Sequence, residues 1–137
     1  MSAAPKIAIL VACADWRLHA RGVDLNARMA GLLGVDGVDV LAVPGPDGLI
    51  LPARSAEWAA LTAAVRVLIR AHDPAALVLA GHQDCAGHRV SDARHARDTV
   101  SAAKALKEET LFPGPVHGFL LVRRSDREWD PQPLAQF

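Results

Sequence analysis

Both cysteines of this chain stand close to residues with which they could share chemistry. Cys13 opens the stretch "CADWR", in which Asp15 and Arg17 follow at intervals of two. Cys85 closes the stretch "HQDC", which begins at His82 and is short enough to bind one ion from a single turn. Two thiolates and one imidazole form a Cys₂His set, an environment of catalytic zinc in which the fourth coordination position stays open. The spacing therefore raises the possibility of a metal site whose third ligand is Cys13.

Each of these residues taken alone has a plainer interpretation. A single cysteine on an apolar strand is usually a small core residue, and a single histidine after a strand is more often a loop residue than a ligand. Asp15 and Arg17 alone would form a surface ion pair that contributes little to stability. In extended backbone, however, their spacing would point both side chains to the same side as Cys13. The combination of all these residues favours a metal site.

Hydrophobic patterning predicts the strands that must position these residues. Near-continuous aliphatic runs are typical of strands covered on both faces. Such runs occupy residues 6–13, 38–45 and 75–81, and a last strand is expected over residues 116–129. Between the second and third strands, residues 44–53 carry three prolines and two glycines, which disfavour regular structure.

Helices are expected between the strands. Apolar residues at helical spacing predict a helix within residues 21–34, for which Gly34 is the C-terminal stop, and a second one over residues 55–72, with Ser55 as its N-cap. A third helix over residues 91–111 is polar with few apolar positions, so we expect it on the outside of the protein.

Alternating strands and helices predict an α/β fold in one domain over residues 1–137. We expect a mostly parallel central sheet of about four to five strands, flanked by helices. In such sheets the functional crevice lies at the carboxyl ends of the strands. Cys13 ends the first strand, and His82 and Cys85 follow the third, so they should converge on one edge of the sheet.

Composition excludes several classes of protein. Lys plus Arg and Asp plus Glu number 15 each and the sequence pI is about 7.0, which argues against a nucleic-acid surface. The apolar run from Ile7 to Ala12 is too short for a secretory signal or a membrane span. We therefore expect a cytoplasmic protein without a membrane partner, whose cysteines are reduced, metal-bound or catalytic rather than joined in a disulfide.

The two motifs resemble those of the β-class carbonic anhydrases. Cys13, Asp15 and Arg17 match the family's C-x-D-x-R motif, and His82 and Cys85 match its H-x-x-C motif. The resemblance covers roughly residues 6–124 and follows the order of the elements. It implies a β-carbonic-anhydrase-like α/β fold that assembles as a homodimer or a higher homo-oligomer, with the site near the subunit interface.

The resemblance also implies a function. Cys13, His82 and Cys85 would hold Zn²⁺, and zinc-bound hydroxide would catalyse the reversible hydration of carbon dioxide to bicarbonate, a carbonic anhydrase-like lyase (carbonate dehydratase) activity. Asp15 would orient the hydroxide or take the fourth position itself, and Arg17 would hold Asp15. One alternative is hydrolysis of carbonyl sulfide or carbon disulfide on the same scaffold, and another is a non-catalytic zinc-binding module.

The chain departs from the family in the loop after its second strand. "VPGPDG" stands where typical members carry an Arg-Asn-Ala-Gly stretch, and the aromatic content is only 4%. His88, three residues after Cys85, is a candidate for proton transfer or metal binding, although a solvent-facing loop position is expected for it and also for His19 and His117. Asp84 would support a ligand by a hydrogen bond or cap the following helix.

Overall fold

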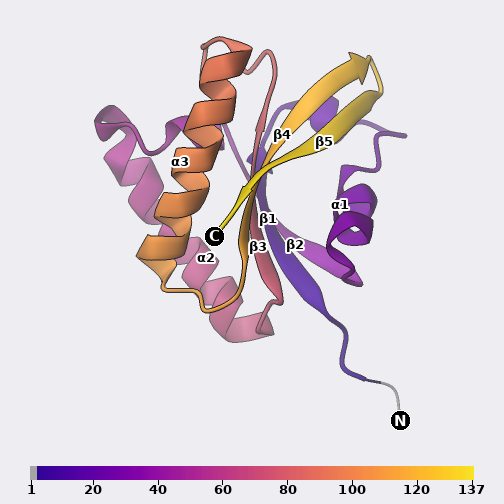
Figure 1. Cartoon of the computed structure of the whole chain (residues 1–137), viewed down its shortest axis with the longest axis vertical. Helices are drawn as coiled ribbons and strands as arrows, with labels where there is room; N and C mark the ends of the chain where they lie inside the picture. The colour runs from indigo at the N-terminus through magenta and orange to yellow at the C-terminus, as the bar shows by residue number, and fades with distance from the viewer. Residues whose placement is uncertain (1–2) are drawn as a thin grey trace.

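A five-stranded sheet forms the centre of the protein in the computed structural model, which describes residues 3–137 (Figure 1). The strands lie in the order β2-β1-β3-β4-β5. Four of them run parallel, and only β5 is antiparallel to its neighbour. Their bounds are β1 Ile7–Cys13, β2 Gly37–Val43, β3 Ala76–His82, β4 Val116–Ser125 and β5 Glu128–Gln136. The expected α/β fold with a mostly parallel sheet is confirmed.

Helices cover both faces of this sheet. Helix α1 (Leu25–Leu33) lies on one face, and α2 (Ser55–His72) and α3 (Asp92–Thr110) lie side by side on the other (Figure 1). The part of the chain that the structure describes also contains three short 3₁₀ turns: η1 (Trp16–Leu18), η2 (Pro46–Gly48) and η3 (Pro52–Arg54). Among residues 3–137, no helix combines the length and the apolar character needed to cross a membrane.

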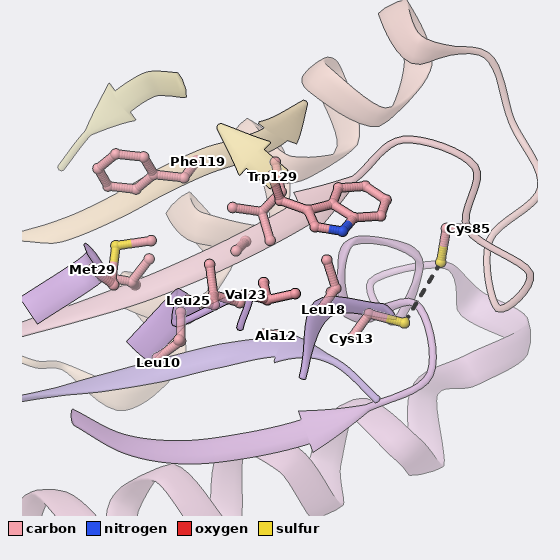
Figure 2. Close-up of a cluster of buried hydrophobic side chains, with 13 residues drawn as sticks. Leu10, Ala12, Cys13, Leu18, Val23, Leu25, Met29, Cys85, Phe119 and Trp129 are labelled. Carbon is pink, nitrogen blue, oxygen red and sulfur yellow. Dashed lines mark hydrogen bonds between the residues drawn. The ribbon is translucent and has the colours of Figure 1, made fainter. Parts of the chain in front are cut away.

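The core is divided into two parts by the sheet, as alternation along β1 requires. Leu10 and Ala12 point to the α1 side, where they pack with Met29 and Trp129 (Figure 2). Ile9 and Val11 point to the α2 and α3 side. Burial on both faces explains why the strands are continuous apolar runs.

The end of the chain differs from the expected single strand over residues 116–129. Strand β4 ends at Ser125, and the chain turns back into β5, which pairs antiparallel with β4. Pro131 and Pro133 lie within β5 and hide it from a pattern-based prediction. They are tolerated because β5 is an edge strand, where one side of the backbone needs no partner.

The helices confirm some expected ends and correct others. Gly34 is the C-cap of α1 with a left-handed φ of 65°, as predicted. Ser55 is the first residue of α2 rather than its N-cap, because Arg54 occupies the capping position without a side-chain bond. The loop at residues 44–53 was expected to be irregular, yet it contains η2 and η3, each with proline in its first turn.

Helix α3 is not the outer helix that its polar sequence predicted. It packs against β3 and β4 through a buried face that includes His95, Asp98 and Thr99 as well as Ala102 and Ala103. The alanines allow a close approach to the sheet, and Asp98 and His95 each bond to a side chain inside the protein. Hydrophobic periodicity fails here because it assigns every polar residue to solvent.

Candidate metal centre

Cys13, His82 and Cys85 meet at the carboxyl edge of the sheet. Cys13 is the last residue of β1 and His82 the last of β3, and these two strands are parallel neighbours. Cys85 returns to the same edge in the turn after β3. One ligand atom from each residue lies within 4.8 Å of the other two, and the sulfurs of Cys13 and Cys85 are 3.8 Å apart (Figure 2). The structure thus brings together the three residues that the sequence singled out.

The orientation of His82 suits a metal ligand. Its Nδ1 donates a hydrogen bond to the backbone carbonyl of Gln83 at 2.6 Å, which fixes the proton on Nδ1 because a carbonyl can only accept. The opposite nitrogen, Nε2, is buried and has no hydrogen-bond partner among residues 3–137. A free imidazole lone pair beside two sulfurs is the donor set that Zn²⁺ prefers.

The sulfurs of Cys13 and Cys85 lie within hydrogen-bond distance, so each thiol shifts the pKa of the other. The hydrogen bond from Cys85 lowers the pKa of Cys13, with smaller contributions from His82 and from the amide of Gly45, which lies 3.4 Å from the Cys13 sulfur. The same hydrogen bond and burial raise the pKa of Cys85. Burial alone lowers the pKa of His82, but the adjacent Cys13 sulfur outweighs it and the net shift is upward. A bound dication would favour both sulfurs as thiolates.

Asp15 and Arg17 are joined to one another beside this centre. The guanidinium Nε of Arg17 lies 3.1 and 3.2 Å from the two carboxylate oxygens of Asp15, and its Nη2 donates to Oδ2 at 2.7 Å. The expected extended geometry is wrong at this point. Asp15 is the N-cap of η1 and accepts from the Arg17 amide at 2.9 Å, so the contact forms within a turn. Arg17 lowers the pKa of Asp15, which stays ionised as an acceptor.

Asp84 extends this network on the outer side. Its exposed carboxylate and its backbone carbonyl each accept from Arg17 at 2.9 Å. Asp84 therefore supports Arg17 rather than a ligand, and it does not cap α3, whose N-cap is Ser91. The geometry makes Arg17 a clamp between the turn after β1 and the turn after β3.

A second arginine, which the sequence analysis missed, clamps the loops after β2 and β3. Arg54 donates to the backbone carbonyls of Pro44 at 2.8 Å, Gly45 at 3.2 Å and Gly87 at 3.0 Å. The two glycines touch: a Cβ on Gly45 would lie 2.6 Å from the carbonyl carbon of Gly87. This contact holds the Gly45 amide against the Cys13 sulfur. Bonds to backbone carbonyls leave no signature in a sequence, so no signal could have found Arg54.

Trp129 is the other supporting residue that the sequence did not reveal. It is 1% exposed and lies in the core cluster on the α1 side of the sheet (Figure 2). Its ring meets the His82 ring edge to face at 5.4 Å. The guanidinium carbon of Arg17 lies 5.7 Å from the centre of the same indole. Trp129 belongs to β5, the strand that patterning did not predict, and its sequence position gives no hint of this contact.

A cleft of about 600 Å³ opens over Cys13. Its walls combine Asp15 and Arg17 with small or apolar residues: Ala14, Trp16, Pro44, Ala86 and Gly87. Trp16 is 75% exposed at the rim of this cleft. The arrangement can hold a metal ion at its floor, present a carboxylate beside it and admit a small molecule.

The remaining histidines have varied surroundings. His19 Nε2 donates to the backbone carbonyl of Cys13 at 2.8 Å, and His117 lies half-buried on β4. The solvent-facing position expected for His88 is wrong. His88 is buried and its Nε2 donates to Asp98 at 2.6 Å. The chain folds the loop after β3 under α3, which sequence spacing alone does not show.

Comparison with known proteins bears on this site. A search of curated proteins returned no match. A protein family described as "Putative carbonic anhydrase" matches residues 3–120, a range that contains every residue of the candidate centre. The match spans most of the chain, and with it the chain belongs to this carbonic anhydrase-like family.

Proposed function

We propose that the protein is a zinc enzyme that catalyses the reversible hydration of carbon dioxide to bicarbonate. The observation that carries this proposal is the buried Cys₂His cluster, in which His82 keeps a free Nε2 next to a carboxylate held by arginine. Cys13, His82 and Cys85 would hold the ion. When bound, Zn²⁺ lowers the pKa of a water molecule towards neutrality and so supplies a nucleophile at neutral pH.

The other residues would orient that nucleophile. Asp15 offers an acceptor beside the cluster that is ionised at neutral pH, because Arg17 lowers its pKa. A hydrogen bond to this acceptor fixes the direction of an attacking oxygen. Arg17 would act as a positioning residue, since both carboxylate oxygens of Asp15 are already bound to it and are thereby kept from the metal.

The cleft suits a small substrate without charge. Its walls at Ala14, Pro44 and Ala86 carry no polar side chains, which favours an apolar molecule. Carbon dioxide fits this chemistry. Carbonyl sulfide and carbon disulfide share its linear, apolar character, and a non-catalytic zinc module would use the same ligands.

Stopped-flow hydration of carbon dioxide by the zinc-loaded protein tests the proposal. We expect activity that rises from neutral to alkaline pH and that Asp15→Asn reduces without loss of zinc. Cys85→Ala should lose both metal and activity, while Glu57→Gln, an exposed change beside the Arg54 clamp, should keep both. Hydrolysis of carbonyl sulfide or carbon disulfide without hydration of carbon dioxide would transfer the proposal to those substrates. A zinc-loaded protein inactive in every assay would be a non-catalytic module and would refute it.

We also propose that the chain works as a homodimer in the cytoplasm. The exposed indole of Trp16, at the rim of the cleft, supports an interface near the site. The free thiols of Cys13 and Cys85 agree with a reducing compartment. Light scattering coupled to size exclusion should give twice the chain mass, and Trp16→Ala should shift it towards the monomer.

A further inference from the structure

A second cluster of metal-binding residue types lies beneath the loops that frame the candidate metal centre. It consists of Asp47 in η2, His88 in the loop after β3 and His95 in the first half of α3. One ligand atom from each lies within 4.8 Å of the other two, and all three side chains are buried. None of these residues takes part in the function proposed above.

Two atoms of this cluster lack the partners that burial demands. His95 Nδ1 lies 2.7 Å from Oδ2 of Asp47, which leaves His95 Nε2 and Asp47 Oδ1 buried with no hydrogen-bond partner among the described residues. His95 is fully buried and Asp47 nearly so. An unpaired polar atom in the interior costs about 1–3 kcal/mol. A cation bound by Asp47 and by Nδ1 of His95 would replace the hydrogen bond between them and give the buried carboxylate a counter-charge, while the proton of His95 would move to Nε2.

Carboxylates fix the orientation of both histidines. Nε2 of His88 donates to Asp98 at 2.6 Å, and Asp98 is in turn bound by Arg94 at 2.9 Å. The rings of His88 and His95 meet edge to face at 5.4 Å. His88 donates Nε2 to Asp98 and so presents Nδ1 as a lone pair, which is the usual support of a metal-binding imidazole.

Glycines make the space for this arrangement. A Cβ on Gly48 would lie 2.6 Å from His88 Nδ1, and a Cβ on Gly81 would lie 2.2 Å from Thr99 Oγ1 and 3.3 Å from Asp47 Oδ2. Side chains at either position would push into the cluster. Thr99 Oγ1 is itself buried without a hydrogen-bond partner among residues 3–137, so a third donor atom lies at its edge.

Charge favours a cation at this place. Asp98 has Arg94 as its counter-ion, whereas no arginine or lysine bonds to Asp47 within the described chain. A buried carboxylate without a strong counter-ion is costly, and a metal ion is one of the few groups that compensate it. Imidazole and carboxylate together suit Zn²⁺ and its transition-metal neighbours, whereas Mg²⁺ and Ca²⁺ prefer oxygen alone.

We propose that Asp47, His88 and His95 form a second metal site, which binds a divalent transition-metal ion of the zinc class. The ion would tie together η2, the loop after β3 and the start of α3. It would thereby stabilise the loops after β2 and β3, which also position the Cys₂His cluster. Its role is structural, since the three ligands are buried and do not line the cleft over Cys13.

Titration of the metal-free protein with Co²⁺ tests this site. Cobalt bound by Cys13 and Cys85 produces thiolate charge-transfer absorption in the near ultraviolet, whereas cobalt bound by Asp47, His88 and His95 cannot. We expect the full chain to bind two equivalents by equilibrium dialysis, with the charge-transfer band complete after one. The second equivalent should also raise the thermal unfolding temperature. Binding of a single equivalent would overturn the proposal, whatever the outcome for carbon dioxide hydration.

Variants and a crystal locate the second ion. His95→Gln and Asp47→Asn should each reduce the stoichiometry from two to one and leave the charge-transfer band intact, whereas His117→Gln, a matched change on β4, should keep both ions. Retention of both ions by the two cluster variants would refute the site. If the variants do not fold, anomalous scattering from a crystal of the cobalt-loaded wild type decides. A peak between the three side chains supports the proposal, and a second peak elsewhere, or no second peak, refutes it.

Discussion

Replacing Arg17 with alanine should lower both the stability of the protein and the turnover at the candidate centre. The substitution removes the paired contacts to Asp15 and the contacts to the side chain and carbonyl of Asp84. Asp15 keeps its bond to the backbone amide of residue 17 but loses its counter-ion. The pKa of Asp15 then returns towards its ordinary range, and its carboxylate becomes free to bind the metal.

The size of the effect follows from the exposure of the partners. The side chains of Arg17 and Asp15 are 20% and 14% exposed, so their paired bond is sheltered and contributes about 2 kcal/mol. The Asp84 side chain is 76% exposed, so solvent screens its contact with Arg17 and this contact contributes little. We expect a loss of roughly 2–3 kcal/mol in the free energy of unfolding. With an m-value of about 2 kcal/mol/M, the urea midpoint falls by roughly 1–1.5 M.

The stability that Arg17 contributes through Asp15 should depend on pH. Because the folded-state pKa of Asp15 is lowered, its contribution to stability is complete above its ordinary pKa and disappears as pH falls through the folded value. The difference between wild type and Arg17→Ala in the free energy of unfolding should therefore shrink below about pH 4. Arg17→Lys is the matched control, since it keeps the charge but not the planar fork, and it should fall between the two.

Urea unfolding of the metal-free proteins from pH 3 to pH 8, together with turnover of the zinc-loaded proteins at neutral pH, checks the reasoning. Turnover should fall in Arg17→Ala, and the cobalt spectrum of this variant should change as a carboxylate enters the coordination sphere. Normal turnover with an unchanged urea midpoint would refute the role of Arg17 as the holder of Asp15. A loss of stability that stays constant down to pH 3 would refute the ion pair as its cause.

Three further predictions follow from the packing around the two clusters. Removal of metal by a chelator should lower the thermal unfolding temperature, because a dication relieves the conflict between the sulfurs of Cys13 and Cys85; calorimetry that shows no change would contradict a metal site. Trp129→Ala should cost about 3–5 kcal/mol by chemical denaturation, since it empties a buried site against His82, and Trp129→Phe should cost less. Gly81→Ala should destabilise by about 1–3 kcal/mol, because its methyl group meets Thr99 Oγ1, and Thr99→Ala in the same chain should recover part of that loss; additive losses in this double-mutant cycle would rule out the clash.

Much of the sheet was predictable because burial on both faces has a simple signature. Strands β1 and β3 are unbroken apolar runs, and their polar neighbours begin where the strands end. Knowing that parallel strands align their carboxyl ends was enough to bring Cys13 and His82 together. Strand β5 escaped prediction because Pro131 and Pro133 usually argue against a strand.

The supports of the candidate centre were hidden for a different reason. Arg54 acts on backbone carbonyls, which every residue possesses, and Trp129 reaches His82 only because β5 folds back along β4. The contact between Asp15 and Arg17 was expected, but from extended backbone, whereas η1 forms it in a turn. Spacing therefore identified the partners without identifying the conformation that joins them.

The polar face of α3 shows how local rules and the fold come into conflict. A helix with His95, Asp98 and Thr99 on one side should expose that side, yet the fold buries it against the sheet. Such violations of local preference tend to occur where a protein needs a site rather than only a core. The loop after β2 gives the Gly45 amide to Cys13 and the Asp47 carboxylate to His95, and the turn after β3 gives Cys85 to one cluster and His88 to the other. Both clusters draw on the same two segments. Ordering of the cluster of Asp47, His88 and His95 therefore fixes the loops that position the Cys₂His cluster.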